Sequence, residues 1–506
     1  MENLLNSLAK SRWNVRAFYA AVVLFFFVMI FLPAVFIIAR TPQFSFSPQM
    51  QDALLVSFEI ALLATFIDVI FGVPVAWLTV RHKFRGREFI NTLVDMPLIV
   101  PTSALGFSVG LFWGAEGLGL VRAGFWQILA LHVAITYPYV VRTVAASLRE
   151  LDINYEIAAR SLGANPLTMF RTVSLPLVQA GLMIGALLSF TRSLGETGAT
   201  MVVAGAVHSG PTLVLAYKNA GDMGSAVGLS LILIVSSTIL LTFAKFWARR
   251  RRVKIGKIYP SFEKFLSGQA AYEKALAVGF LIFIIIIPSF FFVKHLGLNA
   301  DVGLILNSVL ISLAIALAVT AVNLIFAVPM AIFIGRNKRI GGLFDFLSDV
   351  ILVMPTVALG ISLALFWGKT DEILVIALAH LSFTYPYILK PVAESVASVD
   401  VSLEEAARSL GATSIKAFRT ITLPLIMPSI TAGALMAFMR SLSETGTTMA
   451  ISQEVKTIPV LIVDFVKQGK VEDAALACGI LFIISFGVIW MLRRTSTSAN
   501  RKSGGS

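Results

Sequence analysis

Two matched pairs of charged residues lie within otherwise apolar stretches of the chain. Arg192 precedes Glu196 by four positions, and Arg440 precedes Glu444 by the same interval. Residues four apart share one face of a helix, so each pair can form an ion pair within its own helix. Ionisable groups in membrane helices usually face a partner, water or the bundle interior, because contact with lipid is costly. Two interpretations follow: self-neutralising pairs that stabilise each helix, or a central gate where arginine attracts an anion or glutamate a cation.

The remaining ionisable residues in apolar stretches indicate packing rather than chemistry. Asp68 has Asn323 at the matching position later in the chain, which favours a polar contact between helices over a shared role. His132 and His380 match each other, but neither has a carboxylate or thiolate at a metal-ligand spacing. We therefore predict no metal site and no catalytic residue in this chain.

The composition places these residues in a membrane protein. Hydrophobic residues make up 57% and charged residues 14% of the 506 residues, and the mean hydropathy is +0.85. So few polar residues cannot cover a soluble globule of this length. The formal charge of +13 does not indicate nucleic-acid binding, because the basic residues fall in short tracts between apolar spans, where they set topology. A single cysteine, Cys478, excludes a disulfide framework.

Apolar runs predict an all-α membrane protein with about twelve transmembrane helices. The uncharged run 17–39 is long enough to cross a hydrocarbon core of about 30 Å. No small-residue cleavage site follows it, so we expect a retained first span. Five more spans are predicted in the first half, at 53–80, 92–113, 125–147, 177–205 and 226–247. Six are predicted in the second half, at 275–293, 303–335, 345–367, 372–396, 425–451 and 471–492.

One half of the chain is a copy of the other. The stretch EIAARSLGANPLTMFRTVSLPL begins at Glu156, and EEAARSLGATSIKAFRTITLPL begins at Glu404, which is 404 − 156 = 248 positions later. The charged pairs in the following helices are separated by the same interval. Because each half contains an even number of spans, the two copies have the same orientation and are related by an axis along the membrane normal. We expect the solute path between them.

The chain divides into two repeats, a basic linker between them and a polar tail. The boundaries are 1–248 for the first repeat, 249–272 for the linker, 273–494 for the second repeat and 495–506 for the tail. The repeated loops occupy 150–176 and 398–424.

The basic tracts predict the orientation. Tracts such as Arg81–Arg87 and Arg249–Arg252 all fall on one side of the membrane if the N-terminus is cytoplasmic. Because lysine and arginine accumulate in cytoplasmic loops, both termini and both repeated loops are expected in the cytoplasm. The sequence thus predicts a multi-pass protein of the cytoplasmic membrane.

The repeated loop contains the most specific pattern in the sequence. Each copy begins as a short segment rich in small residues and reaches a glycine, Gly163 or Gly411, which is typical of a helix end. The spacing of Glu-Ala-Ala, three residues, Gly, nine residues and Ile-x-Leu-Pro resembles the signature loop of permease subunits of bacterial and archaeal ABC importers. In that family the loop is a coupling helix, which docks on the ATP-hydrolysing subunit.

The two copies match this signature unequally. The second copy carries it on Glu405, Ala406, Ala407 and Gly411, directly after Glu404. The first copy carries it on Ala158, Ala159 and Gly163, with Ile157 at the glutamate position and Glu156 one residue earlier. The resemblance therefore implies two docking loops that need not make identical contacts.

The resemblance implies the type I ABC importer permease fold, a separate ATPase and an extracytoplasmic solute-binding protein. No Gly-x-x-x-x-Gly-Lys-Ser/Thr phosphate loop occurs in the sequence, so this chain is not expected to hydrolyse ATP. ATP and Mg²⁺ would belong to the ATPase, expected to be a homodimer so that each loop finds a site, and no cofactor is expected in this chain. The outer segments 206–225 and 452–473 would receive the binding protein. An ion-coupled secondary transporter is the alternative from another class.

Two resemblances point to different solutes. The segment FTRSLGETGATMVVAG is similar to the matching helix of molybdate, tungstate and sulfate permeases, except that Thr197 and Thr445 stand where that family commonly has an aromatic residue. A fused pair of permeases instead resembles those of ferric-iron and thiamine importers. The expected solute is therefore a small inorganic oxyanion or ferric iron, with thiamine and polyamines as alternatives.

Overall fold

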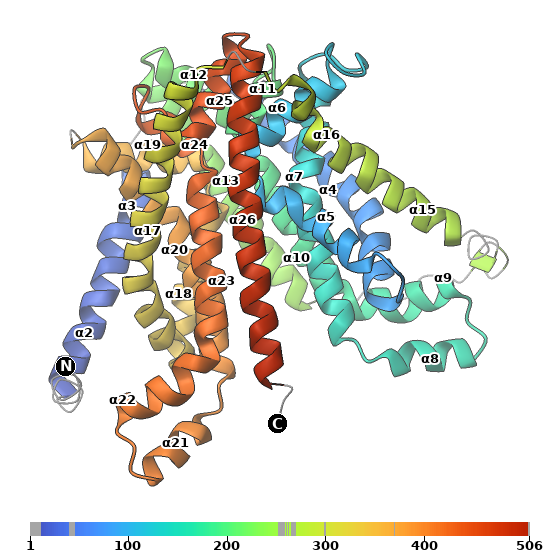
Figure 1. Ribbon diagram of the computed structural model, residues 1–506, viewed down its shortest axis with the longest axis vertical. Helices are drawn as coiled ribbons and strands as arrows, with labels where there is room; N and C mark the ends of the chain where they lie inside the picture. Colours follow the sequence, from blue (N-terminus) through green and yellow to red (C-terminus); the bar gives the residue numbers. More distant parts are fainter. Residues whose placement is uncertain are drawn as a thin grey trace.

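The computed structural model describes residues 12–39, 46–250, 259, 261, 263, 264, 270–297, 300–368 and 370–503. Every regular element in these ranges is a helix, and none is a strand (Figure 1). This confirms the predicted all-α architecture. Within the described ranges, ten helices are long and apolar enough to cross a membrane, and the number of spans rises to twelve if each of two bent helix pairs counts as one.

The helices of the two halves follow the same order. In the first half they are α2 (Arg12–Phe25), η1 (Phe26–Phe31), α3 (Leu32–Val35), η2 (Phe36–Ala39), α4 (Pro48–Arg81), α5 (Arg87–Ile99), α6 (Thr102–Trp113), α7 (Phe125–Glu150), α8 (Ile153–Ser161), α9 (Pro166–Met169), η3 (Phe170–Ser174), α10 (Leu175–Leu194), α11 (Gly198–Val203), α12 (Gly210–Asn219) and α13 (Met223–Arg250). In the second half they are α15 (Ala270–Phe280), η4 (Leu281–Ile286), α16 (Ile287–Phe290), η5 (Phe291–His295), α17 (Val302–Arg336), α18 (Lys338–Val353), α19 (Thr356–Trp367), α20 (Glu372–Ser398), α21 (Val401–Ser409), α22 (Ser414–Ala417), η6 (Phe418–Thr422), α23 (Leu423–Leu442), α24 (Gly446–Ile451), α25 (Ile458–Lys467) and α26 (Val471–Ser503).

The two longest matched helices, α4 and α17, begin at side-chain caps. The Ser47 side chain accepts a hydrogen bond from the Met50 amide at 3.2 Å, and the Asp301 carboxylate accepts one from the Leu304 amide at 3.0 Å. Such caps satisfy amides that have no partner within the helix. Both helices then continue through an apolar sequence to a terminal arginine.

Two of the predicted spans are sharply bent. The span predicted over 92–113 is two helices, α5 and α6, which meet at 105°, and α18 and α19 replace the span predicted over 345–367 with the same bend. The breaks fall at Pro101 and Pro355, whose ψ angles are 132° and 131°. Proline disfavours helical backbone at the preceding residue and donates no amide hydrogen bond. Hydropathy stays high across the break, which is why a single span was expected.

The spans predicted over 177–205 and 425–451 are also interrupted. Helix α10 ends at Leu194 and α11 begins at Gly198, and the same gap separates α23 from α24. The candidate charged pairs sit at these two gaps, so the interruptions position them.

The first span of each half packs against the opposite half. Phe25 of α2 stacks on Phe326 of α17 with ring centroids 3.7 Å apart. In the same way, Phe280 of α15 stacks on Phe71 of α4 at 4.0 Å. Because each exchanged helix contributes apolar area to the other half, separating the halves would expose that area to solvent or lipid.

A buried serine fixes each exchanged helix at its proline. Ser362 of α19 donates to the Pro33 carbonyl at 2.8 Å and accepts the amide four residues further on at 3.0 Å. Ser108 of α6 makes the equivalent pair at Pro288, with distances of 2.6 and 3.0 Å. One hydroxyl thus satisfies a carbonyl and an amide where the proline interrupts the regular helix.

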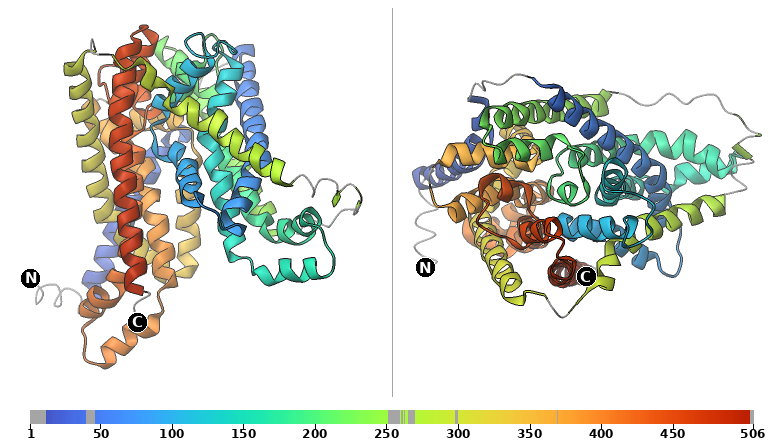
Figure 2. Two further views of the ribbon diagram at one scale, coloured as in Figure 1. Left: turned by 45° about the vertical axis from the view of Figure 1, so that its right-hand side comes forward. Right: turned by 90° about the horizontal axis from the view of Figure 1, so that it is seen from above.

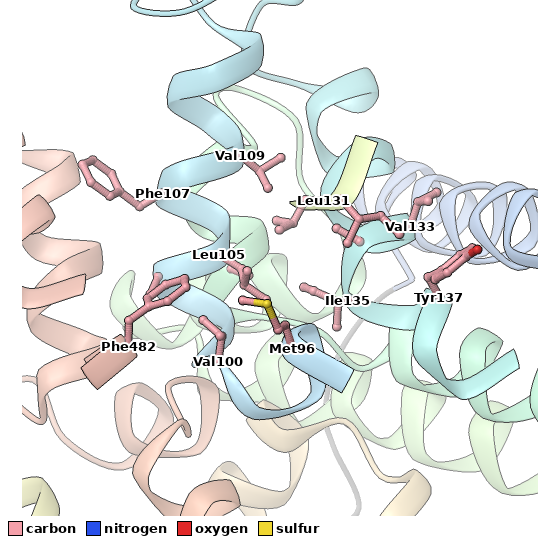
Figure 3. Close-up of a cluster of buried hydrophobic side chains, with 14 of the residues drawn as sticks. Met96, Val100, Leu105, Phe107, Val109, Leu131, Val133, Ile135, Tyr137 and Phe482 are labelled. Atoms are coloured by element: carbon pink, nitrogen blue, oxygen red, sulfur yellow. The ribbon is translucent and has the colours of Figure 1, made fainter. Parts of the chain in front are cut away.

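Both main clusters of buried apolar side chains contain residues from both halves. In one, Leu105 and Phe107 of α6 belong to the same cluster as Phe482 of α26 (Figure 3). In the other, Phe26 of η1 lies against Tyr385 of α20, with ring centroids 5.6 Å apart. The two repeats therefore form one interlocked bundle.

The repeated loops lie at the same end of the bundle, apart from each other. Helices α8 and α21 share this end with the start of α2 and the end of α26, whereas α12 and α25 lie at the opposite end (Figures 1 and 2). Most of the predicted linker, 249–272, lies outside the described residues. Helix α26 continues through most of the predicted tail, to Ser503.

Candidate functional site

Both predicted charged pairs form ion pairs inside the bundle. Arg192 contacts Glu196 at 2.5 Å, and Arg440 contacts Glu444 at 2.7 Å. The glutamates are also hydrogen-bonded: Glu196 accepts from Thr102 at 3.0 Å and from the Ala199 amide at 3.1 Å. Glu444 likewise accepts from an amide of α24 at 2.9 Å. Each glutamate is therefore engaged by an arginine and by at least one further donor, as the self-neutralising interpretation expects.

The two arginines nevertheless reach a common space between the repeats. A cavity of about 40 Å³ is bordered by both Arg192 and Arg440. Its other lining residues are Thr191, Gly195, Ile351, Leu352, Val353, Met354, Thr356, Phe383 and Tyr387. The guanidinium of Arg440 lies over the Phe383 ring, 5.1 Å from its centroid. A cavity of this size holds only one or a few water molecules, so the space between the arginines is narrow in this conformation.

The two helix gaps approach each other next to the arginines. A Cβ on Gly198 would lie 2.3 Å from Thr445 Cβ, and one on Gly446 would lie 3.0 Å from Thr197 Cβ. A side chain at Gly198 would overlap Thr445, and a Cβ at Gly446 would also lie 2.7 Å from the Thr356 hydroxyl, so the approach favours glycine at both positions. The threonines that replace the aromatic residue of the oxyanion permeases are therefore the residues that meet across the boundary between repeats.

The matched histidines contact the helices on both sides of the same gaps. His132 of α7 lies 2.7 Å from the Ser193 hydroxyl in α10 and 2.9 Å from the Thr200 hydroxyl in α11. His380 makes the equivalent contacts, at 2.8 and 3.1 Å, with α23 and α24. Each histidine bridges both sides of one gap, which agrees with the predicted packing role. Among the described residues, no three His, Cys, Asp or Glu side chains gather as a metal site would require.

Asp68 forms the polar helix contact that the sequence predicts. Its carboxylate accepts hydrogen bonds from Thr136 at 2.6 Å and Ser189 at 2.8 Å, which joins α4 to α7 and α10. At the matched position, Asn323 donates to the Thr384 hydroxyl at 2.8 Å. The two side chains differ in charge but make the same kind of link between helices.

The repeated loops have matching helix starts and ends. Helix α8 is capped by Asp152 and α21 by Asp400, whose carboxylates accept amide hydrogen bonds at 3.0 and 2.9 Å. The hydrogen bonds from Ser402 hold the pKa of Asp400 below its ordinary value, so this cap stays ionised at neutral pH. Both helices then stop before a glycine with positive φ, +89° at Gly163 and +87° at Gly411, as predicted.

Glu156 and Glu404 point inward, unlike the other residues expected to dock. Arg81, at the end of α4, contacts Glu156 at 2.9 Å, and Ser174 donates to the same carboxylate at 3.1 Å. Arg336, at the end of α17, contacts Glu404 at 2.5 Å. These carboxylates tie each surface helix to a long helix of the bundle. The exposed members of the predicted docking set are Ala158, Gly163, Glu405, Ala406 and Gly411, and Ala159 and Ala407 are half-buried.

Two exposed leucines are the feature that the sequence reasoning missed. Leu162 is 90% exposed and Leu410 is 91% exposed, each directly before the glycine that ends its helix. A leucine so exposed gains nothing from the folded chain itself and suits contact with a partner. The available signal was an identical leucine in both copies within a polar segment.

The surroundings of the two loops differ. The first copy presents exposed Tyr155 and Ile157, where the second has Leu403 and Glu405. Glu263 of the linker forms an ion pair with Arg171 of the first loop at 2.7 Å. Among the described contacts, the second loop has no equivalent ion pair with the linker. The linker thus touches the segment that returns the first loop to the bundle.

Comparison with known proteins agrees with the duplication. A family model described as "Binding-protein-dependent transport system inner membrane component" matches twice, over residues 68–253 and 327–493. Each match covers one repeated loop and one charged pair, and together they cover more than half of the chain.

Relatives with named functions align with about half of this chain. The sulfate transport system permease protein CysT of Salmonella typhimurium is 32% identical over 239 residues, which are 43% of this chain and 86% of the relative. The molybdenum transport system permease protein ModB of Escherichia coli K12 is 31% identical over 225 residues, 42% of this chain and 98% of the relative. CysT of Synechococcus elongatus is 29% identical over 244 residues, 45% of this chain and 88% of the relative.

The helical bundle, its internal duplication and both family matches agree with the type I ABC permease fold and with a role in transport through a membrane. The chain is a multi-pass membrane protein and belongs, as a fused pair of repeats, to the family of inner membrane components of binding-protein-dependent transport systems.

Proposed function

We propose that this chain is the permease of an ABC importer that moves a small tetrahedral oxyanion, such as sulfate or molybdate, across the cytoplasmic membrane. The observation that supports this most is the pair of arginines, one from each repeat, around one cavity. A guanidinium presents a planar set of donors that matches an oxyanion. The names of the relatives, which refer to sulfate and molybdenum, support the same substrate class.

The carboxylates make ferric iron the weaker candidate. A hard cation prefers oxygen ligands, especially carboxylates. Glu196 and Glu444 are already held by their arginines and by amides at the helix gaps. An anion would reach the two guanidinium groups at the cavity when the repeats separate, without replacing the contacts of the glutamates.

The energy would come from a separate ATPase at the end of the bundle that carries α8 and α21. That end is assigned to the cytoplasm, together with both termini, because basic tracts gather there. A homodimeric ATPase, which binds ATP and Mg²⁺, would engage Leu162 in one loop and Leu410 in the other. Closure of its two subunits would move both loops, and the ion pairs to α4 and α17 would carry that motion into the bundle.

The solute-binding protein would dock at the opposite end. Helices α12 and α25 lie there, and each begins with a proline in its first turn. Both fall in the outer segments that the sequence assigns to this contact. The binding protein would release its anion toward the arginines when the repeats separate.

Uptake into proteoliposomes tests this proposal. The permease, its ATPase and its binding protein are reconstituted, and uptake of radiolabelled sulfate and molybdate is measured with and without ATP. We expect ATP-dependent uptake of an oxyanion that falls at least tenfold in Arg192→Gln with Arg440→Gln, because a transient anion loses both charged donors. Arg142→Gln, which changes an arginine paired with Asp95 away from the cavity, is the control.

Other outcomes would reject parts of the proposal. Full uptake without the ATPase, driven by an ion gradient, would indicate a secondary transporter. Retained uptake and unaltered selectivity in the double arginine variant would remove the gate role. Ferric-iron, thiamine or polyamine uptake in place of oxyanion uptake would replace the substrate class.

A further inference from the structure

A second and much larger cavity lies beside the first repeated loop. Its volume is about 650 Å³, which is in the range of roughly 300 to 1,000 Å³ typical of ligand pockets. Residues of α4, α8, α9, η3 and α10 line it, so it lies between the first repeated loop and the bundle, next to the ion pair of Glu156 with Arg81. Most of its lining is apolar, with Trp77, Met169 and Phe170 among the larger side chains.

The cavity continues an apolar strip on the outer face of α4. Leu62, Phe66 and Ile70 are exposed and follow one another at intervals of four, so they lie along one face of the helix. Ile70 also lines the cavity. In a membrane this strip faces acyl chains, which gives a lipid tail a continuous apolar route from the bilayer into the cavity.

The other end of the cavity is cationic. Arg81, His82 and Arg160 all line it, and the basic tract continues beyond Arg81 along the same loop. The charge of Arg81 is neutralised by its ion pair with Glu156. The net positive charge at this end of the cavity therefore comes from the exposed Arg160. Basic pockets between membrane helices at the cytoplasmic surface suit the head groups of anionic lipids.

The second copy keeps the matched basic residues, Arg336 and Arg408, but lacks other features that would favour such a ligand. Ile157 at the rim of the first cavity corresponds to Glu405, whose carboxylate would repel an anionic head group. Trp77 and Met169 correspond to Ile332 and Ala417, so the apolar contacts also differ. We therefore expect the two repeats to bind an anionic lipid unequally at these matched positions.

We propose that this cavity binds one anionic phospholipid, with an acyl chain along Ile70 and Trp77 and its phosphate near Arg160. The lipid would fill the space between α8 and the bundle and so stiffen the connection that transmits movement of the first loop. This inference uses the cytoplasmic assignment of the loop end but does not depend on which solute is transported.

Quenching of tryptophan fluorescence by brominated lipid tests the proposal directly. The full chain is reconstituted in phosphatidylcholine vesicles that contain acyl-brominated phosphatidylglycerol or, in parallel, acyl-brominated phosphatidylcholine. Subtracting the signal of Trp77→Phe isolates the Trp77 contribution. We expect this contribution to be quenched at lower fractions of brominated phosphatidylglycerol than of brominated phosphatidylcholine.

Matched variants separate a specific site from general contact with the bilayer. Arg160→Gln should weaken the phosphatidylglycerol-dependent quenching about fivefold, because one cation near a membrane surface contributes on the order of 1 kcal/mol. Ile157→Glu, which copies the second loop, should weaken it further. Arg408→Gln, the matched change in the second loop, should leave it unaltered.

Three results would overturn the proposal. Equal quenching by both lipids would mean that Trp77 meets the bilayer without selecting a head group. Unquenched Trp77 fluorescence would mean that no acyl chain enters the cavity. An effect of Arg408→Gln as large as that of Arg160→Gln would mean that the charge of the surface, and not this cavity, attracts the lipid. Oxyanion uptake is not measured here, so failure of the proposed transport function would leave each result interpretable.

Discussion

The two repeated loops share their helix ends and their ion pairs to the bundle, but they differ in part of their exposed surface and in the chain that surrounds them. Both contain a capped helix, a glycine with positive φ, a fully exposed leucine and an inward glutamate paired with an arginine. Only the first is described with the Glu263 contact and the large cavity beside it. One homodimeric partner would require the shared surface, whereas the surroundings of each loop could diverge after duplication. The predictions below test this division.

The largest expected effect follows from placing a side chain at the glycine that ends either loop helix. Gly163→Asp and Gly411→Asp each force a non-glycine residue to adopt positive φ, at about 1–2 kcal/mol, and place a carboxylate on the docking surface. We expect each variant to lose ATP-dependent uptake while inserting normally, as measured in proteoliposomes and by membrane fractionation.

Gly86→Asp is the matched control for backbone strain. Gly86 also has positive φ and open space around its Cβ position, but it lies outside the repeated loops. We expect normal uptake in this variant. Normal uptake in Gly163→Asp beside lost uptake in Gly411→Asp would show that only one loop docks and would break the comparison.

The inward ion pairs should differ in strength. Arg81→Gln leaves Glu156 unpaired at 5% exposure, so we expect a loss of about 3 kcal/mol in unfolding free energy. Arg336→Gln should cost about 1 kcal/mol, because this pair is more exposed to solvent. Denaturant unfolding in detergent measures both. Adding Glu156→Gln to Arg81→Gln should restore part of the loss, and an unchanged loss would reject the ion pair as its cause.

The exposed leucines should contribute equally to docking. Leu162→Ala and Leu410→Ala each remove apolar surface that an ATPase would bury, so we expect affinity for the ATPase to fall about tenfold in either variant. Titration of the reconstituted permease with the ATPase measures this. Leu120→Ala, at an exposed leucine outside the loops, should have no effect, and unequal effects of the first two changes would argue against a symmetric partner.

A further comparison concerns the exchanged first helices, where the repeats are again alike. Ser108→Ala and Ser362→Ala each leave a buried carbonyl and amide without their hydroxyl partner, which we expect to cost about 1–2 kcal/mol. Thermal unfolding in detergent should show similar shifts for both variants. A large difference would mean that one exchanged helix is held much more firmly than the other.

Much of the fold follows from patterns that a sequence displays directly. Apolar runs locate the long helices, the recurring loop establishes the duplication, and Gly163 and Gly411 mark real helix ends. The bends at Pro101 and Pro355 were not predicted, because proline in an apolar stretch hardly lowers hydropathy. The exchange of first helices was also missed, since a membrane helix is apolar on every face and its periodicity does not identify its neighbour.

The candidate site was predictable in its residues but only partly in its geometry. The spacing of Arg192 and Glu196 was sufficient to expect an ion pair, whereas convergence of Arg192 and Arg440 on one cavity depends on how the repeats pack. The inward direction of Glu156 depends on Arg81, 75 positions earlier in the chain. Local patterns carry no record of such distant partners.

Because of the exchanged first helices, the covalent connection between the repeats is not the main contact that holds them together. Each half packs against a helix that belongs to the other half, through the stacking of Phe25 on Phe326 and of Phe280 on Phe71. Cleavage of the chain between residues 250 and 259 would therefore leave two fragments that stay associated. Two separately expressed polypeptides divided at that point should associate in the membrane and assemble into the whole permease.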